Sequence, residues 1–489
     1  MKKWLFVIGL AAGLVACNPD EPDPGTDPTV DPEDTTAVAV DDEDDLVENS
    51  TWNQTVSIVW NGASASVTGA SDSVVVTEKN GVVTVNAEAK HVEYVLSGTG
   101  TGQLNMYSDY KLKLTLSDLS LTCSDGPAIN NQSHKRTFVV LEGTNVLADG
   151  ASYATSTEDR KAALFSEGQL IFSGSGSLAV TGNYKHAVAS DDYVRVVGGT
   201  LKLTSKVNDG LHANDGVVFN GGLTTIVSAD EGVQCDSAGI VIAGGVLNIT
   251  SVNKGIKALG DIVISGGDVA VVAGSGSSSS TEGIESKAAV TISGGKVFVQ
   301  ASDDAINSGG DFTISGGYVC AYSTGNDGID ANGDCYVKGG VVYAIGARSP
   351  EMAIDANSED RKQLYVQGGT IVAIGGLESG ASLEQSCYQA SSWTANKWYA
   401  LTVGSDTFLF LTPSSGGTTM VVSAASKPTM KSGISVSGGT KIFNEMGVIG
   451  GSFSGGSDVS LSDYSGGSSG PGGGGHGPGG GPGGGPGGW

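Results

Sequence analysis

The sequence predicts an all-β protein, a right-handed parallel β-helix with a small C-terminal β module. Glycine contributes 77 of the 489 residues, and each interior glycine weakens an α-helix by about 1 kcal/mol relative to alanine. The rest of the body is rich in Val, Ile and Thr, which favour strands. Gly-Gly pairs recur through residues 198–369, and such a period indicates a stack of repeated coils.

The Gly-Gly pairs set the length of one coil. The pairs begin at residues 198, 221, 244, 266, 294, 316, 339 and 368. Successive pairs are 22 or 23 residues apart, except for two longer steps that contain insertions at 274–281 and 348–361. In the unit Asp327–Ile345, three short apolar runs, each closed by a Gly or Asn turn, predict three strands. Such a unit cannot close a core alone, so we expect the coils to stack in parallel about 4.8 Å apart.

The chain divides into five expected segments. They are a lipoprotein signal peptide over 1–17, an acidic disordered tether over 18–50, the β-helix over 51–375, a small β accessory module over 376–462 and a Gly/Pro-rich tail over 463–489. Residues 51–69 would cap the first coil. Leucine-rich repeats would need a Leu ladder with Asn at fixed spacing, and propeller blades about 40 residues, so the sequence disfavours both.

The N-terminus indicates export and a lipid anchor. Lys2 and Lys3 precede the apolar run 4–14, which is too short to span a bilayer. Residues 14–17, LVAC, look like a bacterial lipobox with lipidation at Cys17. Residues 18–50 hold 13 acidic residues and no basic one, a composition that cannot fold by itself and that resembles the export signal of surface lipoproteins. We expect a lipid-anchored protein of the bacterial outer membrane, exposed at the cell surface, with no other membrane contact.

The net charge and the cysteine spacing limit which partners and bound groups the sequence allows. The formal net charge is −26, which excludes nucleic acid as a partner because such binding needs basic residues to neutralise phosphates. The five cysteines beyond Cys17 show no metal-binding or disulfide spacing. We expect them to be small buried residues of the stacked core. They are Cys123, Cys235, Cys320, Cys335 and Cys387.

Aligning the coils on their first strand produces two polar columns. The first column reads Asp209, Glu231, Lys254, Glu282, Asp304 and Asp327, and the second reads His212, Gln234, Lys257, Glu285, Asn307, Asp330 and Asp355. Carboxylates stacked at the coil spacing repel one another, and divalent cations with oxygen ligands relieve that repulsion, which suits calcium. The predicted ligands are Asp209, Asp230, Glu231, Glu282, Glu285, Asp303, Asp304, Asn307, Asn326, Asp327, Asp330 and Asp355. The alternative is that these Asp and Asn residues only bond the backbone of turns.

Basic and aromatic residues could contact a ligand beside these columns. Lys254 and Lys257 are basic where their neighbours are acidic. They would either contact sugar carboxylates, act as the base of a lyase, or pair with Glu231, Glu282 or Glu285. Tyr318 and Tyr343 could form an outer stripe on successive coils that stacks on sugar rings; the alternative is that they belong to the core.

The chain resembles a known family at this point. DGxxA coils, the segment GTNVLADG at 143–150, the lipoprotein signal and the Gly/Pro tail are similar to the carbohydrate-binding parallel β-helix lipoproteins, which are related in fold to the family 9 pectate lyases. The resemblance covers about residues 55–375. It implies binding of cellulose or acidic sugars and bound calcium. The lyases bind calcium through an Asp-Asp-x-x-Asp group, from which 303–307 and 326–330 each depart by one Asn.

We therefore expect a surface-anchored, calcium-dependent binder of polysaccharides, with acidic, pectin-like plant cell-wall glycans preferred and cellulose as another possible ligand. One alternative is a calcium-dependent lyase that cleaves uronate polymers by β-elimination, with Lys257 or Lys254 as the candidate base. A second alternative is a structural surface protein or adhesin.

Overall fold

The computed structural model describes residues 41–276 and 281–466. The predicted signal peptide with Cys17, most of the tether and the tail beyond residue 466 lie outside these residues. In the described residues the protein is all-β apart from three short 3-10 turns, η1 (Glu43–Asp45), η2 (Val47–Asn49) and η3 (Ser358–Asp360). No helix in this part of the chain is long and apolar enough to cross a membrane.

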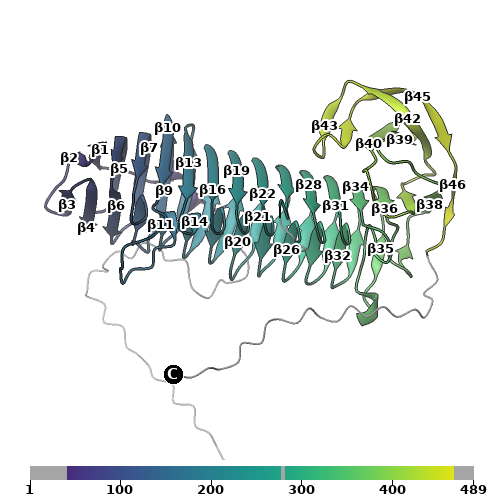
Figure 1. Ribbon diagram of the computed structural model, residues 1–489, viewed down its shortest axis with the longest axis horizontal. Helices are drawn as coiled ribbons and strands as arrows, with labels where there is room; N and C mark the ends of the chain where they lie inside the picture. The colour runs from purple at the N-terminus through teal and green to yellow at the C-terminus, as the bar shows by residue number, and fades with distance from the viewer. Residues whose placement is uncertain (1–40, 277–280, 467–489) are drawn as a thin grey trace, which may run out of the picture. The chain divides into compact units, whose positions relative to one another are not determined.

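Three parallel ladders run through the body, one for each strand of the repeated coil (Figure 1). The first ladder consists of β4 (Val82–Ala87), β6 (Gln103–Ser108), β8 (Ile129–Asn131), β11 (Ala162–Ser166), β14 (His186–Ser190), β17 (Leu211–Ala213), β20 (Val233–Cys235), β23 (Ile256–Ala258), β26 (Ile284–Ser286), β29 (Ile306–Ser308) and β32 (Ile329–Ala331).

The second ladder follows the first within each coil. It consists of β9 (Thr137–Glu142), β12 (Leu170–Gly174), β15 (Tyr193–Val196), β18 (Gly216–Phe219), β21 (Ile240–Ile242), β24 (Ile262–Ile264), β27 (Val290–Ile292), β30 (Phe312–Ile314), β33 (Cys335–Val337), β35 (Leu364–Val366) and β37 (Ser382–Leu383).

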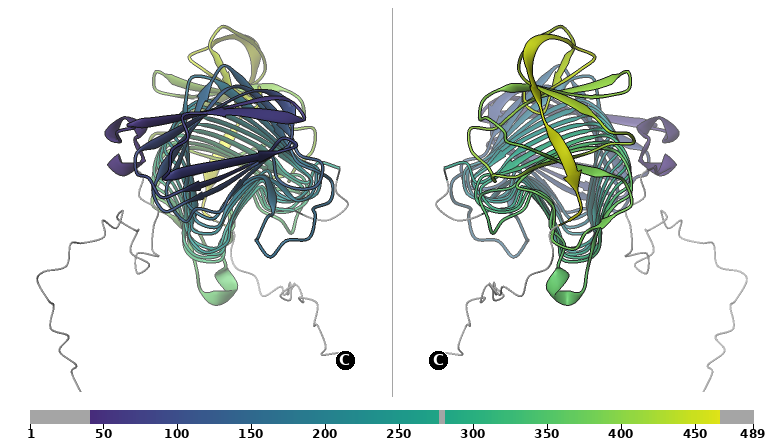
Figure 2. Two further views of the ribbon diagram at one scale, coloured as in Figure 1. Left: turned by 90° about the vertical axis from the view of Figure 1, so that its left-hand side faces the viewer. Right: turned by 90° about the vertical axis from the view of Figure 1, so that its right-hand side faces the viewer.

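The third ladder completes the coil. It consists of β1 (Gln54–Gly62), β5 (Val92–Thr101), β7 (Leu112–Thr122), β10 (Thr144–Ala148), β13 (Ser177–Gly182), β16 (Thr200–Ser205), β19 (Leu223–Ser228), β22 (Val246–Ser251), β25 (Asp268–Val272), β28 (Lys296–Ala301), β31 (Tyr318–Ser323), β34 (Val341–Ile345) and β36 (Thr370–Ile374). Seen end-on, the coils superpose around one interior (Figure 2). The parallel sheets are consistent with a β-helix-like fold.

The register explains the sequence repeat. In the second ladder Ile240 lies opposite Ile262, and both point into the core, whereas Val263 between the buried Ile262 and Ile264 faces outward. Each coil thus places its apolar residues on those of the next, and one continuous core results. The five cysteines at 123, 235, 320, 335 and 387 are buried and unpaired, as predicted.

The Gly-Gly pairs form the turns between the second and third ladders. Gly245 has a φ of +79°, which L side chains rarely adopt. A Cβ on the preceding Gly244 would lie 2.4 Å from the carbonyl oxygen of Asn220 in the coil before. Both positions therefore need glycine, one for its backbone conformation and one for its close approach to the neighbouring coil.

Antiparallel strands border the stack at both ends. At the N-terminal end β2 (Ser64–Thr68) pairs with β1, and β3 (Val74–Lys79) pairs with β4. At the other end β41 (Met420–Ser423) pairs with β36, and β38 (Cys387–Ala390) pairs with β41 and with β46 (Leu461–Tyr464). A separate antiparallel sheet contains β43 (Thr440–Ile442), β44 (Gly447–Ile449), β40 (Asp406–Leu411), β39 (Trp398–Val403), β42 (Thr429–Ser437) and β45 (Ser452–Val459).

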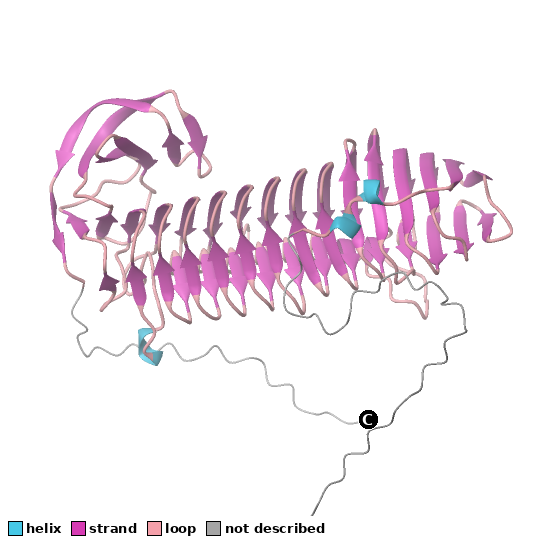
Figure 3. Cartoon of the chain, turned by 180° about the vertical axis from the view of Figure 1, so that it is seen from behind, coloured by secondary structure: helices cyan, strands magenta, loops and turns pink. Residues whose placement is uncertain are grey.

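Residues 42–49 differ from the prediction of an acidic tether that extends to residue 50. They form η1 and η2, which lie across the strands of the body (Figure 3). Asp45 is 1% exposed, and its carboxylate accepts a hydrogen bond from the hydroxyl of Tyr193 at 2.6 Å. Arg136 Nε at 2.8 Å and Arg195 Nε at 2.5 Å supply its counter-charges. These long-range pairs order the last acidic residues of the segment.

Candidate functional site

The two predicted columns are present on the first ladder with the predicted alignment. Strand pairing places His212, Gln234, Lys257, Glu285, Asn307 and Asp330 opposite one another in succession. Isolated parallel bridges join Ile329 to Ile354 and Ile354 to Leu377. The second column therefore continues beyond Asp330 to Asp355, which follows Ile354, and then to Glu378, which follows Leu377.

The side-chain contacts divide the columns into three sections. We call them the histidine section (His186, Asp209 and His212), the ion-paired section (Glu231, Lys254, Lys257, Glu282, Glu285 and Lys287) and the carboxylate section (Asp303, Asp304, Asp327, Asp330, Asp355 and Glu378). They follow one another along the stack in this order, because each coil adds one residue to each column.

Three aspartates of the first column share one structural role. Asp209 Oδ1 accepts a hydrogen bond from the backbone N–H of Glu231 at 3.2 Å, and Asp304 Oδ1 accepts one from the N–H of Asp327 at 3.0 Å. Asp327 Oδ1 accepts one from the N–H of Met352 in the same way. Each of these aspartates thus binds the backbone of the next coil through one carboxylate oxygen, which leaves its second oxygen for other contacts.

The carboxylate section gathers negative charge. Single carboxylate oxygens of Asp327, Asp330 and Asp355 lie within 4.8 Å of one another. Burial, and then the charges of Asp330, Glu351 and Glu378, raise the pKa of Asp327 to about 7. Burial together with Glu378 raises the pKa of Asp355 well above its ordinary range. Fixed oxygens at this spacing form the kind of donor set that calcium takes.

Asn307 and Asn326 use their amide nitrogens on neighbouring carboxylates. Asn307 Nδ2 donates to Asp304 at 3.1 Å and to Asp330 at 2.8 Å, and Asn326 Nδ2 donates to Asp303 at 2.8 Å. Burial and the charge of Asp330 still raise the pKa of Asp304. The two amides therefore offset part of the repulsion between the carboxylates. The sequence alone fits this role and the predicted role of Asn307 and Asn326 as metal ligands equally well.

The ion-paired section balances its charge with lysines. Lys254 Nζ lies 3.2 Å from Glu282 and contacts Glu285, which also contacts Lys287. Lys257 Nζ lies 3.1 Å from Glu231. Burial opposes the charge of Lys254, but the hydrogen bond to Glu285 and the charges of Glu282 and Glu285 raise its pKa overall. Of the roles that the sequence left open for these lysines, the structure contains the ion pairs.

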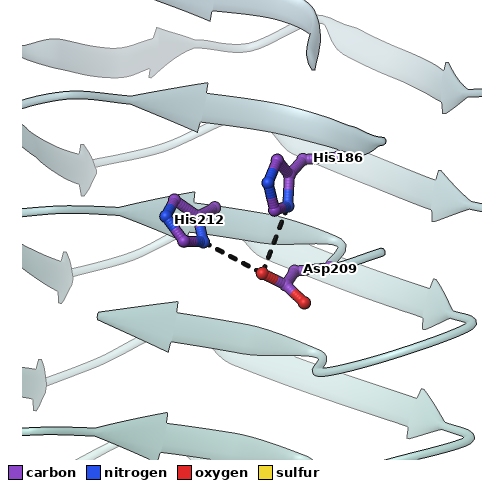
Figure 4. A group of neighbouring side chains, drawn as sticks. All are labelled: His186, Asp209 and His212. Carbon is purple, nitrogen blue, oxygen red and sulfur yellow. Dashed lines mark hydrogen bonds and ion pairs between the residues drawn. The ribbon is translucent and has the colours of Figure 1, made fainter. Parts of the chain in front are cut away.

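The histidine section includes His186, which the sequence analysis did not select as a site residue. His186 occupies the first-column position one coil before Asp209, and both His186 and His212 approach the same oxygen, Asp209 Oδ2 (Figure 4). The distances are 3.1 Å from His186 Nδ1 and 2.9 Å from His212 Nδ1. Burial, and then the charges of His212 and Lys161, lower the pKa of His186. The sequence signal was the alignment of HAVA at 186–189 with DGLH at 209–212.

The predicted tyrosine stripe is not a free surface. Tyr343 is fully buried, its hydroxyl donates to the carbonyl of Leu411 at 2.9 Å, and its ring packs against Phe408 and Phe410. Tyr318 is half-buried at the edge of the same apolar cluster. The prediction that Tyr343 contacts sugar is therefore wrong, because the C-terminal strands cover the outer face of the third ladder at this position.

A different tyrosine pair faces outward. Tyr336 on β33 and Tyr365 on β35 lie in register, with ring centroids 4.9 Å apart and an interplanar angle of 9°. Lys338 Nζ lies 4.7 Å from the centre of the Tyr336 ring. The sequence contained a signal for this pair, since each tyrosine stands three residues before its Gly-Gly pair.

The comparisons with known proteins bear on this surface. A family model described as "Carbohydrate-binding domain-containing protein" matches residues 79–328. No curated protein matches the chain. Among solved structures, a gadolinium derivative of the polysaccharide lyase-like protein from C. thermocellum is similar to this chain, with 20% identity and a TM-score of 0.44 over 49% of this chain and 96% of that chain. The family model spans just over half of the 489 residues and includes the histidine section, the ion-paired section and the start of the carboxylate section. The chain belongs to the family of carbohydrate-binding domain-containing proteins.

Proposed function

We propose that this protein binds acidic polysaccharides through calcium held by the carboxylate section, and that it is displayed on the bacterial outer membrane through a lipid on Cys17. The family match supports a carbohydrate as the ligand class. The observation that carries the calcium-bridged mechanism is the convergence of Asp327, Asp330 and Asp355 within 4.8 Å.

The charge of the protein decides how an acidic glycan can bind. At a formal net charge of −26, direct attraction of a polyuronate is unfavourable. A divalent cation that shares its oxygen ligands between protein and glycan reverses the sign of that interaction. Calcium keeps six to eight oxygen ligands, so three protein carboxylates leave room for sugar carboxylates or hydroxyls. The mechanism therefore requires that glycan binding depend on the cation.

The outward tyrosine pair lies beside the carboxylate section. Tyr336 and Tyr365 lie on the second ladder, on coils that also supply Asp330 and Asp355. The two rings stack on each other, and Lys338 Nζ lies over the ring of Tyr336, so the pair offers ring edges and hydroxyl groups to a glycan more than a flat platform. We propose that this pair contacts the glycan, in place of the buried Tyr343.

The lyase alternative finds less support in the lysines. A general base must lose its proton near neutral pH, and the pKa of Lys254 is shifted in the opposite direction by Glu285 and Glu282. Lys257 Nζ lies 3.1 Å from Glu231, which fixes it as an ion-pair partner. We therefore propose binding without cleavage.

Retention on immobilised polygalacturonate, with cellulose as a neutral comparison, tests the proposal. Wild-type protein should be retained in calcium and released by EDTA. Asp330→Asn should weaken retention about 10-fold or more, whereas the control Asp268→Asn, an exposed acid on the third ladder beside Lys296, should not. Retention that survives EDTA would refute the calcium bridge, and new absorbance near 232 nm, which signals unsaturated uronate product, would refute binding without cleavage.

A further inference from the structure

The histidine section differs chemically from the rest of the columns. Its three residues are almost completely buried, with Asp209 2%, His186 5% and His212 7% exposed. One atom of each lies within 4.8 Å of the others, and the two imidazole rings lie with their centroids 4.4 Å apart. Two ring nitrogens and one carboxylate oxygen therefore converge on one small volume (Figure 4).

Hydrogen bonds leave this volume electron-rich. Asp209 Oδ1 is held by the N–H of Glu231 at 3.2 Å, which directs Oδ2 to the histidines. His212 Nε2 lies 3.2 Å from Asp236 Oδ2. His212 Nδ1 hydrogen-bonds Asp209 Oδ2 at 2.9 Å. A neutral imidazole has one N–H, so in the tautomer with that proton on Nε2, facing Asp236, Nδ1 presents its lone pair to a cation beside Asp209.

His186 adds a buried nitrogen that lacks a hydrogen bond. Its Nδ1 lies 3.1 Å from Asp209 Oδ2, but it makes no hydrogen bond there or with any other described atom. A buried ring nitrogen without a hydrogen bond is unfavourable. A cation between the two nitrogens and the carboxylate would satisfy all three atoms at once.

We propose that His186, Asp209 and His212 bind a divalent transition-metal ion of the zinc class. Zinc bonds of about 2.0–2.2 Å to nitrogen and oxygen put neighbouring ligand atoms roughly 2.9 Å apart around an octahedral ion and 3.3 Å apart around a tetrahedral one. The measured separations of 2.9 and 3.1 Å lie in that interval.

The ligand chemistry separates this site from the calcium site of the proposed function. Imidazole nitrogen suits zinc, cobalt, nickel and copper, whereas calcium takes oxygen ligands. Asp236 Oδ2, 3.2 Å from His212 Nε2, stands where the carboxylate partner of a metal-bound histidine stands. The two sites lie at different ends of the same columns, so each can be removed without the other.

Cobalt(II) titration of the EDTA-treated, dialysed full-length protein tests the inference, because a site with nitrogen ligands gives visible absorption bands that report on coordination. We expect one cobalt ion bound and displaced by zinc. His186→Gln and His212→Gln should each lower the affinity at least 10-fold. Asp236→Asn should lower it about 10- to 100-fold, as loss of a carboxylate that orients a metal-bound histidine does.

Three controls keep the result interpretable. His134→Gln changes a histidine whose side chain is 78% exposed and should leave cobalt binding unchanged, as should Asp268→Asn on the third ladder, whose side chain is 55% exposed. Near-ultraviolet circular dichroism checks that each variant is folded, and Asp236→Asn, whose side chain is 47% exposed, tests the site without altering the core. The absence of cobalt bands in wild-type protein would overturn the inference, and so would bands that persist unchanged in His212→Gln.

Discussion

Asp355→Asn is expected to change the stability of the protein in opposite directions with and without calcium. The carboxylate of Asp355 lies within 4.8 Å of those of Asp327 and Asp330. At that separation and an effective dielectric constant of about 20, two unit charges repel by about 3.5 kcal/mol. Proton uptake by the cluster relieves part of this repulsion. Asparagine at this position needs neither a buried charge nor an extra proton, so the substitution should raise the free energy of unfolding by about 1–3 kcal/mol in EDTA near pH 8.

Calcium should reverse the sign of this effect. An ion that binds only the folded state stabilises it by mass action. Loss of one carboxylate ligand that weakens calcium binding 10- to 100-fold removes about 1.4–2.7 kcal/mol of that stabilisation at saturating calcium. The asparagine keeps the shape of the side chain, and its amide can donate to Glu378, the neighbour that accompanies Asp355. The variant should be the more stable protein in EDTA and gain less from calcium than wild type does.

Thermal melts of both proteins in EDTA and in millimolar calcium check this expectation. Asp268→Asn supplies the control, because its side chain is 55% exposed and lies 3.5 Å from Lys296; exposed substitutions of this kind change stability within about 0.5 kcal/mol. A lower melting temperature of Asp355→Asn in EDTA would refute the repulsion argument. An equal calcium effect in variant and wild type would refute the assignment of Asp355 as a ligand.

Three further predictions concern pH, the lysines and the anchor. The folded-state pKa of Asp327 is about 7 against an ordinary 3.8, so the folded state holds a proton that the unfolded state loses. The stability that Asp327 contributes to the metal-free protein should therefore be complete below about pH 4 and disappear as pH rises through 7. A melting temperature in EDTA that instead rises over this interval would contradict the prediction. Lys254→Met should lower the free energy of unfolding by about 3 kcal/mol, since it leaves the buried Glu285 with fewer counter-charges; denaturant titration measures this, and a change below about 0.5 kcal/mol would show the pair to be unimportant. Cys17→Ala should release the protein from the membrane fraction, and continued sedimentation with membranes would point to another anchor.

The alignment of the polar columns could be predicted because stacking makes it one-dimensional. Once the repeat length is known, the residue that follows each Gly by two positions must lie beside its equivalent in the next coil, as His212 and Gln234 do. The repeat length does not predict which neighbouring side chain a lysine contacts. Lys254 turns to Glu282 and Glu285 in the following coil, and Lys257 turns back to Glu231. The spacing alone allowed either direction.

The sequence repeat could not predict contacts between segments that are far apart in the chain. Tyr343 is buried because β40, which ends at Leu411, lies over the third ladder, and no local pattern reports such a cover. Asp45 belongs to a segment whose composition predicts disorder, yet Arg136 and Arg195 bind its carboxylate across about 90 to 150 residues of chain. In both cases the deciding partner follows far along the sequence.

The antiparallel strands at the two ends of the stack have a consequence for assembly. If the third ladder stopped at β36, the outer edge of β36 would carry unpaired backbone N–H and C=O groups. The first strand of the same ladder in a second copy could pair with them, and chains could add end to end without limit. Pairing of β41 with β36 and of β2 with β1 reverses the strand direction at each terminus. The strand added at each of these ends therefore runs against the ladder of a second copy, which disfavours the parallel pairing that would join molecules into fibres.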